Sequence, residues 1–243
     1  MQAPTKIFDI QRSGDRFFAD HGWLRTYHSF SFADYRDPAN VNWSALRVFN
    51  DDHVAAGEGF PTHPHRDMEI ITYVLDGNLE HKDSMGNHGV VGPGGVQYMS
   101  AGTGVRHSEF NHSSASELHF VQMWVVPDRA GRAPAYGQRD FTLADRFDRW
   151  LDVAGGTSLP SAAVRLGQDA GLRVAHIEKA TLEHRFAAGR LGFLFVADGT
   201  IDANGARLKP GDAVRIGGVD QLTLRGSGEV VLWDLPALSS ESQ

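Results

Sequence analysis

The stretch GFPTHPHRDMEIITYVLDG, residues 59–77, decides the fold class that we expect for this chain. Its second half contains IITYVL at 70–75, a short apolar run rich in β-branched residues that ends at an Asp-Gly pair, so it predicts a buried strand followed by a tight turn. Its first half carries His63 and His65 on either side of Pro64, which favours an extended backbone. The stretch therefore predicts β-structure that holds two histidines two positions apart.

Apolar runs of the same kind recur along the chain and are separated by Gly, Pro, Asn and Asp, which is typical of an all-β sandwich or barrel. The runs that we expect to form strands are 45–50, 70–75, 96–99, 118–126, 191–197, 213–216, 221–224 and 229–235. One segment differs. FTLADRFDRWLDVA (141–154) has helical spacing at Phe147, Trp150 and Leu151 and predicts a short connecting helix.

A repeated order of features divides the chain into two similar halves. Residues 73–99 and 195–216 each contain a strand, an Asp-Gly turn, a polar strand, a second Gly turn, a Pro-Gly corner and another strand. This order is typical of one face of a small jelly roll, and two copies predict two similar β domains in tandem. The stretch 128–145 is loop-like, so we assign residues 1–135 to the first domain and residues 136–243 to the second.

The composition excludes several classes of protein. A length of 243 residues with 27 Gly, 10 Pro and 41% hydrophobic residues is typical of a globular, turn-rich protein with a proper core. The net charge of −7 and the absence of any run of Lys or Arg argue against a nucleic-acid or anionic-membrane partner. No cysteine is present, so disulfides and thiolate metal sites are excluded. Without an apolar leader or a run of 18 apolar residues, we expect a soluble, cytoplasmic protein.

Two pairs of metal-type ligands occur at strand spacing: His63 with His65, and His107 with Glu109. Because residues i and i+2 of a strand face the same side with Cα atoms about 6–7 Å apart, each pair can reach one ion. Four nitrogen and oxygen ligands without sulfur favour divalent iron, manganese, cobalt, nickel or copper over a closed structural zinc site. An octahedral ion in this site would keep two positions open for dioxygen, water or substrate.

Glu69 competes with Glu109 for the fourth ligand position, because in many metal barrels the acidic ligand follows a His-x-His pair by three or four residues. Spacing alone leaves both carboxylates open. Eight further histidines occur singly, and we expect them to be structural: His21, His28, His53, His81, His88, His112, His119 and His176.

The motifs around these ligands resemble those of a known family. G-x5-HPH-x3-E, from Gly57 to Glu69, is similar to the first cupin motif, and 102–111 keeps the G-x2-H-x3-N core of the second, with Gly102 where proline is usual. ADHGWLRTYHSFSFADY (19–35), together with the stretches at 46–77 and 99–111, resembles the pirin family, bicupins that include bacterial quercetinases. The resemblance extends from about residue 8 to about residue 127, and the second half is similar only in outline.

The resemblance implies two tandem cupin jelly-roll barrels, an all-β bicupin, with a metal in the first domain. It implies His63, His65, His107 and Glu109 as ligands of one divalent transition metal and leaves Glu69 a structural role. Iron is the metal that we expect, with manganese, cobalt, nickel, copper and zinc as alternatives. The implied reaction is that of a quercetin 2,3-dioxygenase, which opens the flavonol quercetin with dioxygen and releases carbon monoxide.

The second domain is expected to be a degenerate cupin without metal ligands. Aligning the Asp-Gly turns at 77 and 199 shifts the numbering by 122, so Arg185 and Ala187 stand at the positions of His63 and His65. His184 is one residue away, and a slip of one residue turns a side chain to the opposite face. Around 224–226, LRG replaces the HSE of the first domain.

If the protein is a dioxygenase, Glu109 is the expected catalytic base, because a carboxylate beside the ion can accept the proton of a substrate hydroxyl. Two other functions use the same barrel. A metal or redox sensor would bind a regulatory protein partner without turnover, and an isomerase or epimerase would use catalytic His and Tyr without a metal. The pairs of metal-type ligands favour the dioxygenase over the isomerase.

Overall fold

The computed structural model describes residues 5–237, which form strands connected by short loops. The N-terminal half contains β1 (Ile7–Gln11), β2 (Phe17–Asp20), β3 (Leu24–His28), β4 (Leu46–Val54), β5 (Gly59–His65), β6 (Glu69–Asp76), β7 (Leu79–Asp83), β8 (His88–Val91), β9 (Val96–Ser100), β10 (Val105–Asn111), β11 (Leu118–Val125) and β12 (Ala135–Arg139). The C-terminal half contains β13 (Leu151–Gly155), β14 (Val164–Arg165), β15 (Gly171–Ile177), β16 (Leu182–Arg185), β17 (Leu191–Val196), β18 (Thr200–Ala203), β19 (Ala206–Leu208), β20 (Ala213–Gly217) and β21 (Gln221–Leu235). A 3-10 turn, η1 (Ser13–Asp15), and one short helix, α1 (Leu143–Arg146), complete the described part.

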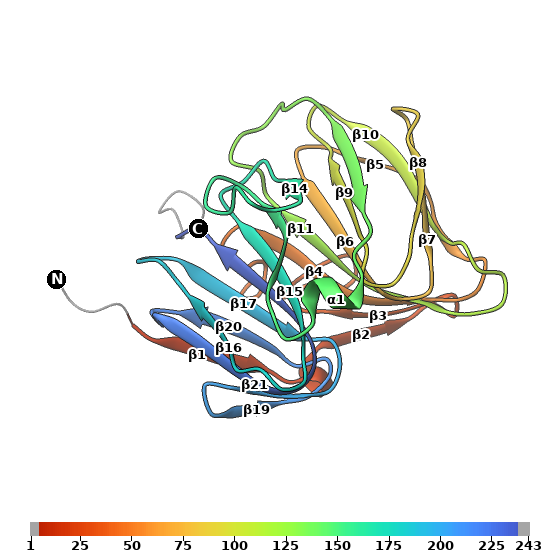
Figure 1. Cartoon of the computed structure of the whole chain (residues 1–243). Helices are drawn as coiled ribbons and strands as arrows, with labels where there is room; N and C mark the ends of the chain where they lie inside the picture. Colours follow the sequence, from red (N-terminus) through yellow and green to blue (C-terminus); the bar gives the residue numbers. More distant parts are fainter. Residues whose placement is uncertain (1–4, 238–243) are drawn as a thin grey trace.

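The two tandem jelly rolls expected from the sequence are confirmed. A seven-stranded sheet of order β12-β9-β6-β11-β4-β3-β2 and a four-stranded sheet of order β5-β10-β7-β8 enclose the first barrel (Figure 1). A ten-stranded sheet forms the second, with β1-β20-β17-β21-β15-β13-β14 as its main path and β16, β18 and β19 attached through β21. Within residues 5–237, no helix has the length and apolar character needed to cross a membrane.

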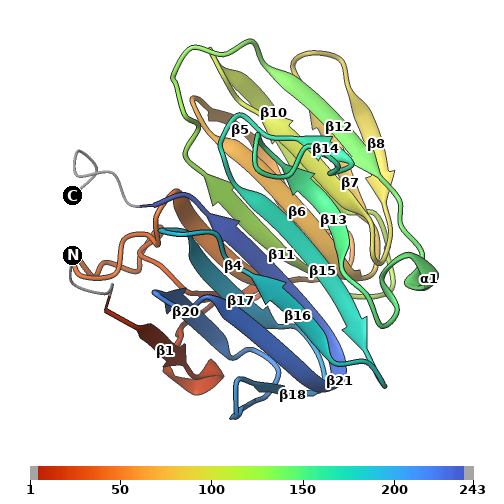
Figure 2. The same cartoon turned by 60° about the vertical axis from the view of Figure 1, so that its left-hand side comes forward.

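The two barrels pack against each other through one face of each large sheet (Figure 2). The largest cluster of buried apolar side chains joins both halves and includes Phe49 and Met123 from the first with Phe193, Phe195 and Trp233 from the second. Phe49 lies between Phe193 and Phe195, with ring centroids 5.0 and 4.9 Å away. Because strand side chains alternate between faces, this contact leaves the other face of each sheet to the interior of its own barrel.

The two barrel interiors differ in chemistry. The second is filled by a continuous apolar cluster that includes Phe186, Leu194, Leu222 and Leu224. The first holds two smaller apolar clusters, one around Phe120 and one of Ile70, Met99 and Val105. The space between them in the first barrel is therefore available to polar side chains.

Strand pairing joins the two halves across the expected boundary between residues 135 and 136. β1 belongs to the N-terminal part of the chain but pairs with β20 of the second barrel, with Ile7 opposite Gly217. β12 extends the first sheet as far as Arg139 by pairing with β9. The two halves are consequently held together by hydrogen-bonded strands as well as by the apolar contact, and the division at 135/136 stays a prediction.

The expected helix over 141–154 is wrong in extent. α1 covers only Leu143–Arg146, and Leu151–Gly155 forms strand β13. The helix ends early because Phe147, the residue after Arg146, is already extended at φ −74° and ψ 119°. Asp148 follows at φ 54°, and its Oδ1 accepts backbone hydrogen bonds from 178–180. The apolar residues that suggested a helix here pack on the second barrel from a non-helical segment, among them Trp150.

A second difference concerns 221–235, where two strands were expected and one bent strand, β21, is present. Its first part pairs with β16 and β18, and its second part with β15 and β17. The change of partner strands occurs at Gly226 and Gly228, whose φ angles of 128° and 145° are rarely adopted by residues with a side chain. Glycine therefore allows one strand to pair in both parts of the ten-stranded sheet.

This bend gives a stability prediction. A Cβ atom on Gly228 would lie 2.0 Å from the carbonyl oxygen of Asp198, so Gly228→Ala combines backbone strain with a steric overlap. We expect a loss of about 2 kcal/mol or more in the free energy of unfolding, seen in thermal unfolding as a Tm lower by about 5 °C or more. Gly137→Ala is the control, because a Cβ there meets no described atom within 4 Å. An equal effect of both substitutions would contradict this account of the bend.

Candidate metal centre

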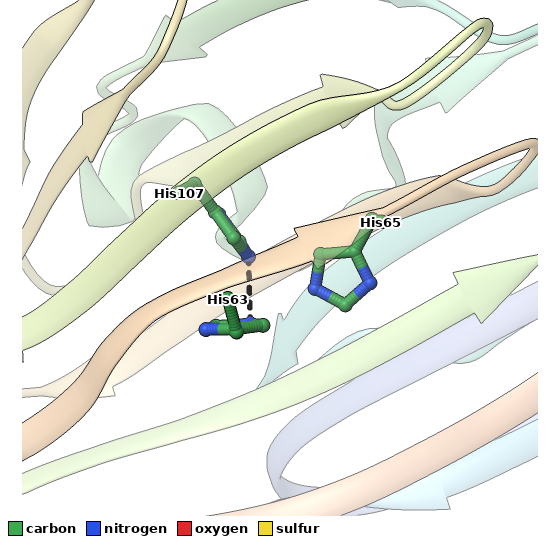
Figure 3. Close-up of side chains that lie close together, drawn as sticks. All are labelled: His63, His65 and His107. Atoms are coloured by element: carbon green, nitrogen blue, oxygen red, sulfur yellow. Dashed lines mark hydrogen bonds between the residues drawn. The ribbon is translucent and has the colours of Figure 1, made fainter.

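Three histidines converge on one point inside the first barrel. β5 and β10 pair antiparallel with His63 opposite His107 and His65 opposite Val105, so the three imidazoles come from two adjacent strands (Figure 3). Their ring centroids are 4.5 to 4.8 Å apart. The expectation that the i and i+2 spacing brings His63 and His65 to one face with His107 agrees with this arrangement.

The distances between these nitrogens fit a bound ion. Nε2 of His63 and Nε2 of His107 lie 3.0 Å apart, which is the separation of two ligands about 2.1 Å from one ion at a right angle. One ligand nitrogen from each of the three histidines lies within 4.8 Å of the others. Nδ1 of His63 is 2.8 Å from the carbonyl oxygen of Pro61, and a proton on Nδ1 leaves Nε2 free to bind a metal.

Burial keeps these imidazoles in the form that binds metals. It lowers the pKa of His65 to about 4, and the neighbouring His107 and His63 add to the shift. Burial also lowers the pKa of His107, although the charge of Glu109 opposes it. His65 and His107 are therefore neutral near pH 7, with a lone pair available to a cation.

Glu109 lies beside His107 but belongs to a second group of potential ligands, formed with His81 and His107. Its Oε1 accepts a hydrogen bond of 2.7 Å from Nε2 of Gln97, and its Oε2 accepts one of 2.8 Å from Nε2 of Gln122. These two amides fix the carboxylate at the inner wall of the barrel. His107 is thus shared between the three-histidine group and the group that contains Glu109.

The carboxylate of Glu109 is ionised despite its burial. Burial alone would raise its pKa, but His107 and His81, together with the hydrogen bond from Gln122, outweigh that effect and lower the pKa of Glu109. An ionised, hydrogen-bonded carboxylate can act as a ligand or as a proton acceptor.

His81 is the site residue that sequence reasoning assigned to a structural role. It lies opposite Glu109 on β7 and is fully buried, with Nε2 3.2 Å from Oδ2 of Asp83 and its ring stacked on Tyr136 at 4.4 Å. The sequence indicates a shared face for His81 only through its alternation with Leu79 and Asp83 on a polar strand. That alternation does not predict that β7 pairs with β10 and brings His81 to Glu109.

Glu69, the other candidate carboxylate, points away from the histidines. Its side chain accepts hydrogen bonds from the hydroxyls of Tyr98 and Ser100 at 2.6 and 2.7 Å and from the backbone N–H of Gly167 at 2.9 Å. Ile70, the next residue on β6, faces the interior of the first barrel, so Glu69 lies on the face that meets the second barrel. Its contacts join the two halves of the molecule.

A third group, Asp51, His53 and His119, lies outside the first barrel's interior and fits an ion poorly. The rings of His53 and His119 stack in parallel with centroids 3.9 Å apart. Imidazole lone pairs lie in the ring plane, so parallel stacked rings cannot both direct one at the same ion. Nε2 of His119 instead lies 2.7 Å from Oδ1 of Asp51, and Oδ2 of Asp51 binds Arg16.

In the second barrel, the residues at the positions of the first-barrel ligands differ from those expected from the sequence. On β16 and the residue after it, the buried side chains are Leu182, His184 and Phe186, whereas Arg185 is exposed. The ring centroids of His184 and Phe186 lie 4.5 Å apart, with an angle of 83° between the ring planes. The rings of His63 and His65 have nearly the same arrangement, at 4.7 Å and 82°. His184 therefore faces inward and not outward, because Phe186 precedes the start of β17 by five positions, whereas His65 precedes the start of β6 by four, and this extra residue shifts the alternation.

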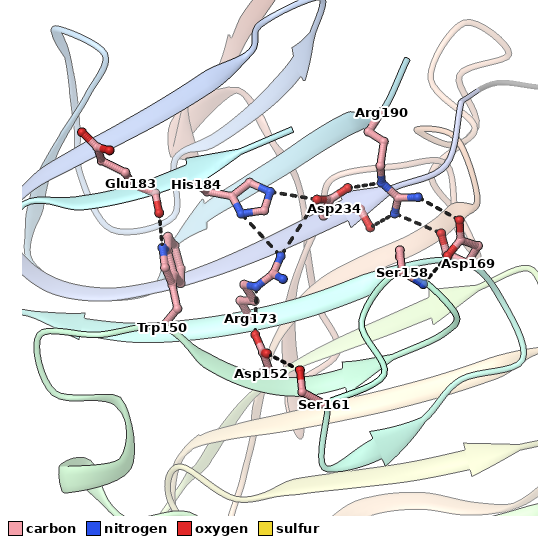
Figure 4. A network of polar contacts seen from close by, with 10 residues as sticks. All are labelled: Trp150, Asp152, Ser158, Ser161, Asp169, Arg173, Glu183, His184, Arg190 and Asp234. Atoms are coloured by element: carbon pink, nitrogen blue, oxygen red, sulfur yellow. Dashed lines mark hydrogen bonds and ion pairs between the residues drawn. The ribbon is translucent and has the colours of Figure 1, made fainter. Parts of the chain in front are cut away.

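The counterpart of HSE also differs from the expected LRG. His184 pairs with Leu222 in β21, as His63 pairs with His107, so Leu222 and Leu224 stand where His107 and Glu109 stand. Both ring nitrogens of His184 are engaged: Nε2 lies 2.8 Å from Oδ2 of Asp234, and Arg173 donates to Nδ1 at 3.4 Å (Figure 4). Of the four positions, His184 alone keeps a metal-type residue.

Comparisons with known proteins agree with this architecture. Residues 11–125 match the family model described as Pirin, and residues 160–235 match the one described as the quercetinase C-terminal cupin domain. The chain is 42% identical over 230 residues to a quercetin 2,3-dioxygenase of Escherichia coli, covering 93% of this chain and 98% of that protein. It is 42% identical over 219 residues to a pirin-like protein of Caulobacter vibrioides, covering 89% and 94%.

A solved structure of a bacterial pirin from Escherichia coli in complex with nickel(II) superimposes with a TM-score of 0.89 at 40% identity, covering 95% of this chain and 100% of that one. The fold and the three-histidine group define a bicupin with a candidate metal centre in its first barrel. The chain belongs to the pirin family.

The geometry predicts the metal content. We expect roughly one divalent transition-metal ion per chain, held by the three-histidine group, and a sharp loss of metal in His65→Ala because one ligand is removed. Elemental analysis of the purified proteins measures both. His53→Ala is the matched control, because its stacked ring does not point at an ion, and it should keep its metal. Two ions per chain, or loss of metal in His53→Ala alone, would contradict the assignment.

Proposed function

We propose that this protein is a metal-dependent dioxygenase that opens the flavonol quercetin with dioxygen and releases carbon monoxide. In this proposal His63, His65, His107 and Glu109 hold one divalent transition metal, with iron the expected ion. The observation that carries the proposal is that His63, His65 and Glu109 line one cavity of about 350 Å³ with mainly apolar walls, while His107 belongs both to the group of His63 and His65 and to the group of Glu109. Small-molecule sites commonly have this size and lining. The relatives named quercetin 2,3-dioxygenase support the choice of substrate.

A divalent ion bound there would supply Lewis acidity and a template for substrate and dioxygen. The chain supplies the rest. His63, His65 and Glu109 line the cavity, so a substrate hydroxyl that reaches the histidines also comes near the ionised carboxylate. Glu109 accepts the hydroxyl proton on one of its oxygens. Gln97 and Gln122, which donate to opposite oxygens of Glu109, hold the carboxylate in position for that transfer.

The cavity walls suit a flat aromatic substrate. Phe32, Phe60 and Trp124 line it together with Leu24, and Trp124 packs edge-on against His65 with centroids 4.8 Å apart. Aromatic walls exclude water and offer stacking or edge contacts to the rings of a flavonol.

The C-terminal half has a structural role in the same proposal. Its barrel keeps His184 but substitutes Phe186, Leu222 and Leu224 at the other ligand positions, and this apolar filling leaves it without a metal centre. The division into a metal-binding domain, residues 1–135, and a structural copy, residues 136–243, follows from this difference in chemistry.

The two buried glutamates give opposite predictions. Glu109→Gln should weaken metal binding and lower quercetin turnover by about a hundredfold or more, because an amide is a poorer ligand and no base at neutral pH. Glu69→Gln should keep the metal and most of the activity, since its contacts are with Tyr98, Ser100 and Gly167. Metal content and steady-state rates test both variants, and the reverse pattern would transfer the ligand role to Glu69.

The activity itself is the next prediction. Protein loaded with iron, manganese, cobalt, nickel or copper should consume quercetin and dioxygen together. Loss of the visible absorption of the flavonol and trapping of carbon monoxide measure the reaction. Activity should disappear under argon, after chelation and in His107→Ala. If no metal form changes quercetin in air, the dioxygenase proposal is wrong for this substrate, and a metal-dependent pull-down would then test a regulatory protein partner.

A further inference from the structure

A row of polar side chains crosses the inner face of the seven-stranded sheet. Directly opposite pairs on neighbouring strands connect its five members, and every one of them is buried. The members, in order from β3 to β9, are His28, Asn50, Gln122, Thr72 and Gln97. The inner face of a jelly-roll sheet normally packs apolar side chains, as the second barrel does here, so a continuous polar row indicates a function.

One end of the row donates hydrogen bonds to Glu109. Gln122, Thr72 and Gln97 all donate to Glu109, at 2.8, 3.5 and 2.7 Å. This part of the row therefore belongs to the candidate metal centre already described.

The other end of the row is not satisfied. Oδ1 of Asn50 and Nδ1 of His28 make no hydrogen bond of ordinary geometry with any residue between 5 and 237. The same holds, among those residues, for Oγ1 of Thr26 and Oδ1 of Asp52, which lie opposite each other one step along the strands. We call these four residues, Thr26, His28, Asn50 and Asp52, the polar floor.

The polar floor is part of the same cavity as the histidines. All four side chains line it together with His63 and His65, and they are only 2 to 4% exposed. Leaving buried polar groups unpaired is costly. Four such groups beside an apolar wall form a site that is incomplete without a polar ligand.

The charges of the polar floor select the kind of ligand. Burial lowers the pKa of His28 to about 4, so its imidazole is neutral. Burial raises the pKa of Asp52 to about 7. The floor thus carries no cation that would attract an anionic ligand. Oxygens that accept hydrogen bonds predominate, so a ligand must offer O–H donors.

We propose that the polar floor is a specificity subsite that binds a hydroxyl-bearing aromatic ring of the substrate, while another part of the same molecule lies at His63 and His65. The aromatic walls formed by Phe32, Phe60 and Trp124 accommodate the flat ring, and the floor accepts its hydroxyl protons. This inference rests on the proposed function, because it assigns the parts of a polyhydroxylated flavonol to parts of one cavity.

Binding measurements under argon test the subsite without turnover. The probes are quercetin, which has hydroxyls on its outer rings, and 3-hydroxyflavone, which lacks them. Metal-loaded wild type, Asn50→Leu and Thr26→Val are titrated with each probe by quenching of tryptophan fluorescence. Thr103→Val is the matched control, because Thr103 is exposed on a loop outside the cavity.

We expect Asn50→Leu and Thr26→Val each to weaken quercetin binding by about tenfold, the effect of one lost hydrogen bond. Binding of 3-hydroxyflavone should change by less than about twofold, and Thr103→Val should change neither. The ligand-free Tm of both variants should be unchanged or higher, because an apolar group replaces an unpaired polar one. A structural role for these residues would instead lower the Tm.

Equal weakening of both probes, no weakening of quercetin, or no binding of either probe would overturn the subsite. The result of this binding test can be distinguished from the result of the activity test of the proposed function. If quercetin shows the expected binding pattern under argon and is not consumed in air, the subsite stands and the dioxygenase proposal fails. If quercetin is consumed and the pattern is absent, the reverse holds.

Discussion

The apolar contact between the two large sheets is the interaction on which the rest of the structure depends. Phe49, Phe193 and Trp233 lie at its centre, and Nε1 of Trp233 is 3.1 Å from the sulfur of Met123 across it. Because strand side chains alternate, burying one face of each sheet in this contact decides which residues enter the barrels. On β6, Ile71 and Tyr73 face the other half, whereas Thr72 faces Glu109.

The two barrels use the same frame for different purposes. In the second barrel, apolar side chains fill the interior and an ionic network of Arg173, His184 and Asp234 lies where the first barrel has its candidate metal centre (Figure 4). Arg190 adds a second guanidinium to Asp234. A guanidinium supplies positive charge without needing ligand lone pairs, so this barrel is stabilised by the chain's own cations.

In the first barrel, rigid strands rather than loops hold the reactive groups. His63 is fixed through the carbonyl of Pro61, and Glu109 is fixed by two amides. Such preorganisation reduces the rearrangement needed when a ligand binds. The polar row extends from the residues around Glu109 to Asn50 and His28, so the metal-type ligands and the polar floor belong to one continuous polar surface.

The sequence by itself determined the strand class, the repeat and the convergence of His63, His65 and His107. Apolar runs, Asp-Gly turns and i, i+2 spacing are local signals, and a strand fixes which of its own residues share a face. Tertiary structure decided which face that is and which strands are neighbours. It turned Glu69 toward the second barrel, brought His81 to Glu109, shifted His184 inward through one extra residue before the next strand, and ended α1 at Arg146. The polar floor draws on two strands and the polar row on five, and no local pattern encodes that pairing because each member is a single polar residue in an otherwise ordinary strand.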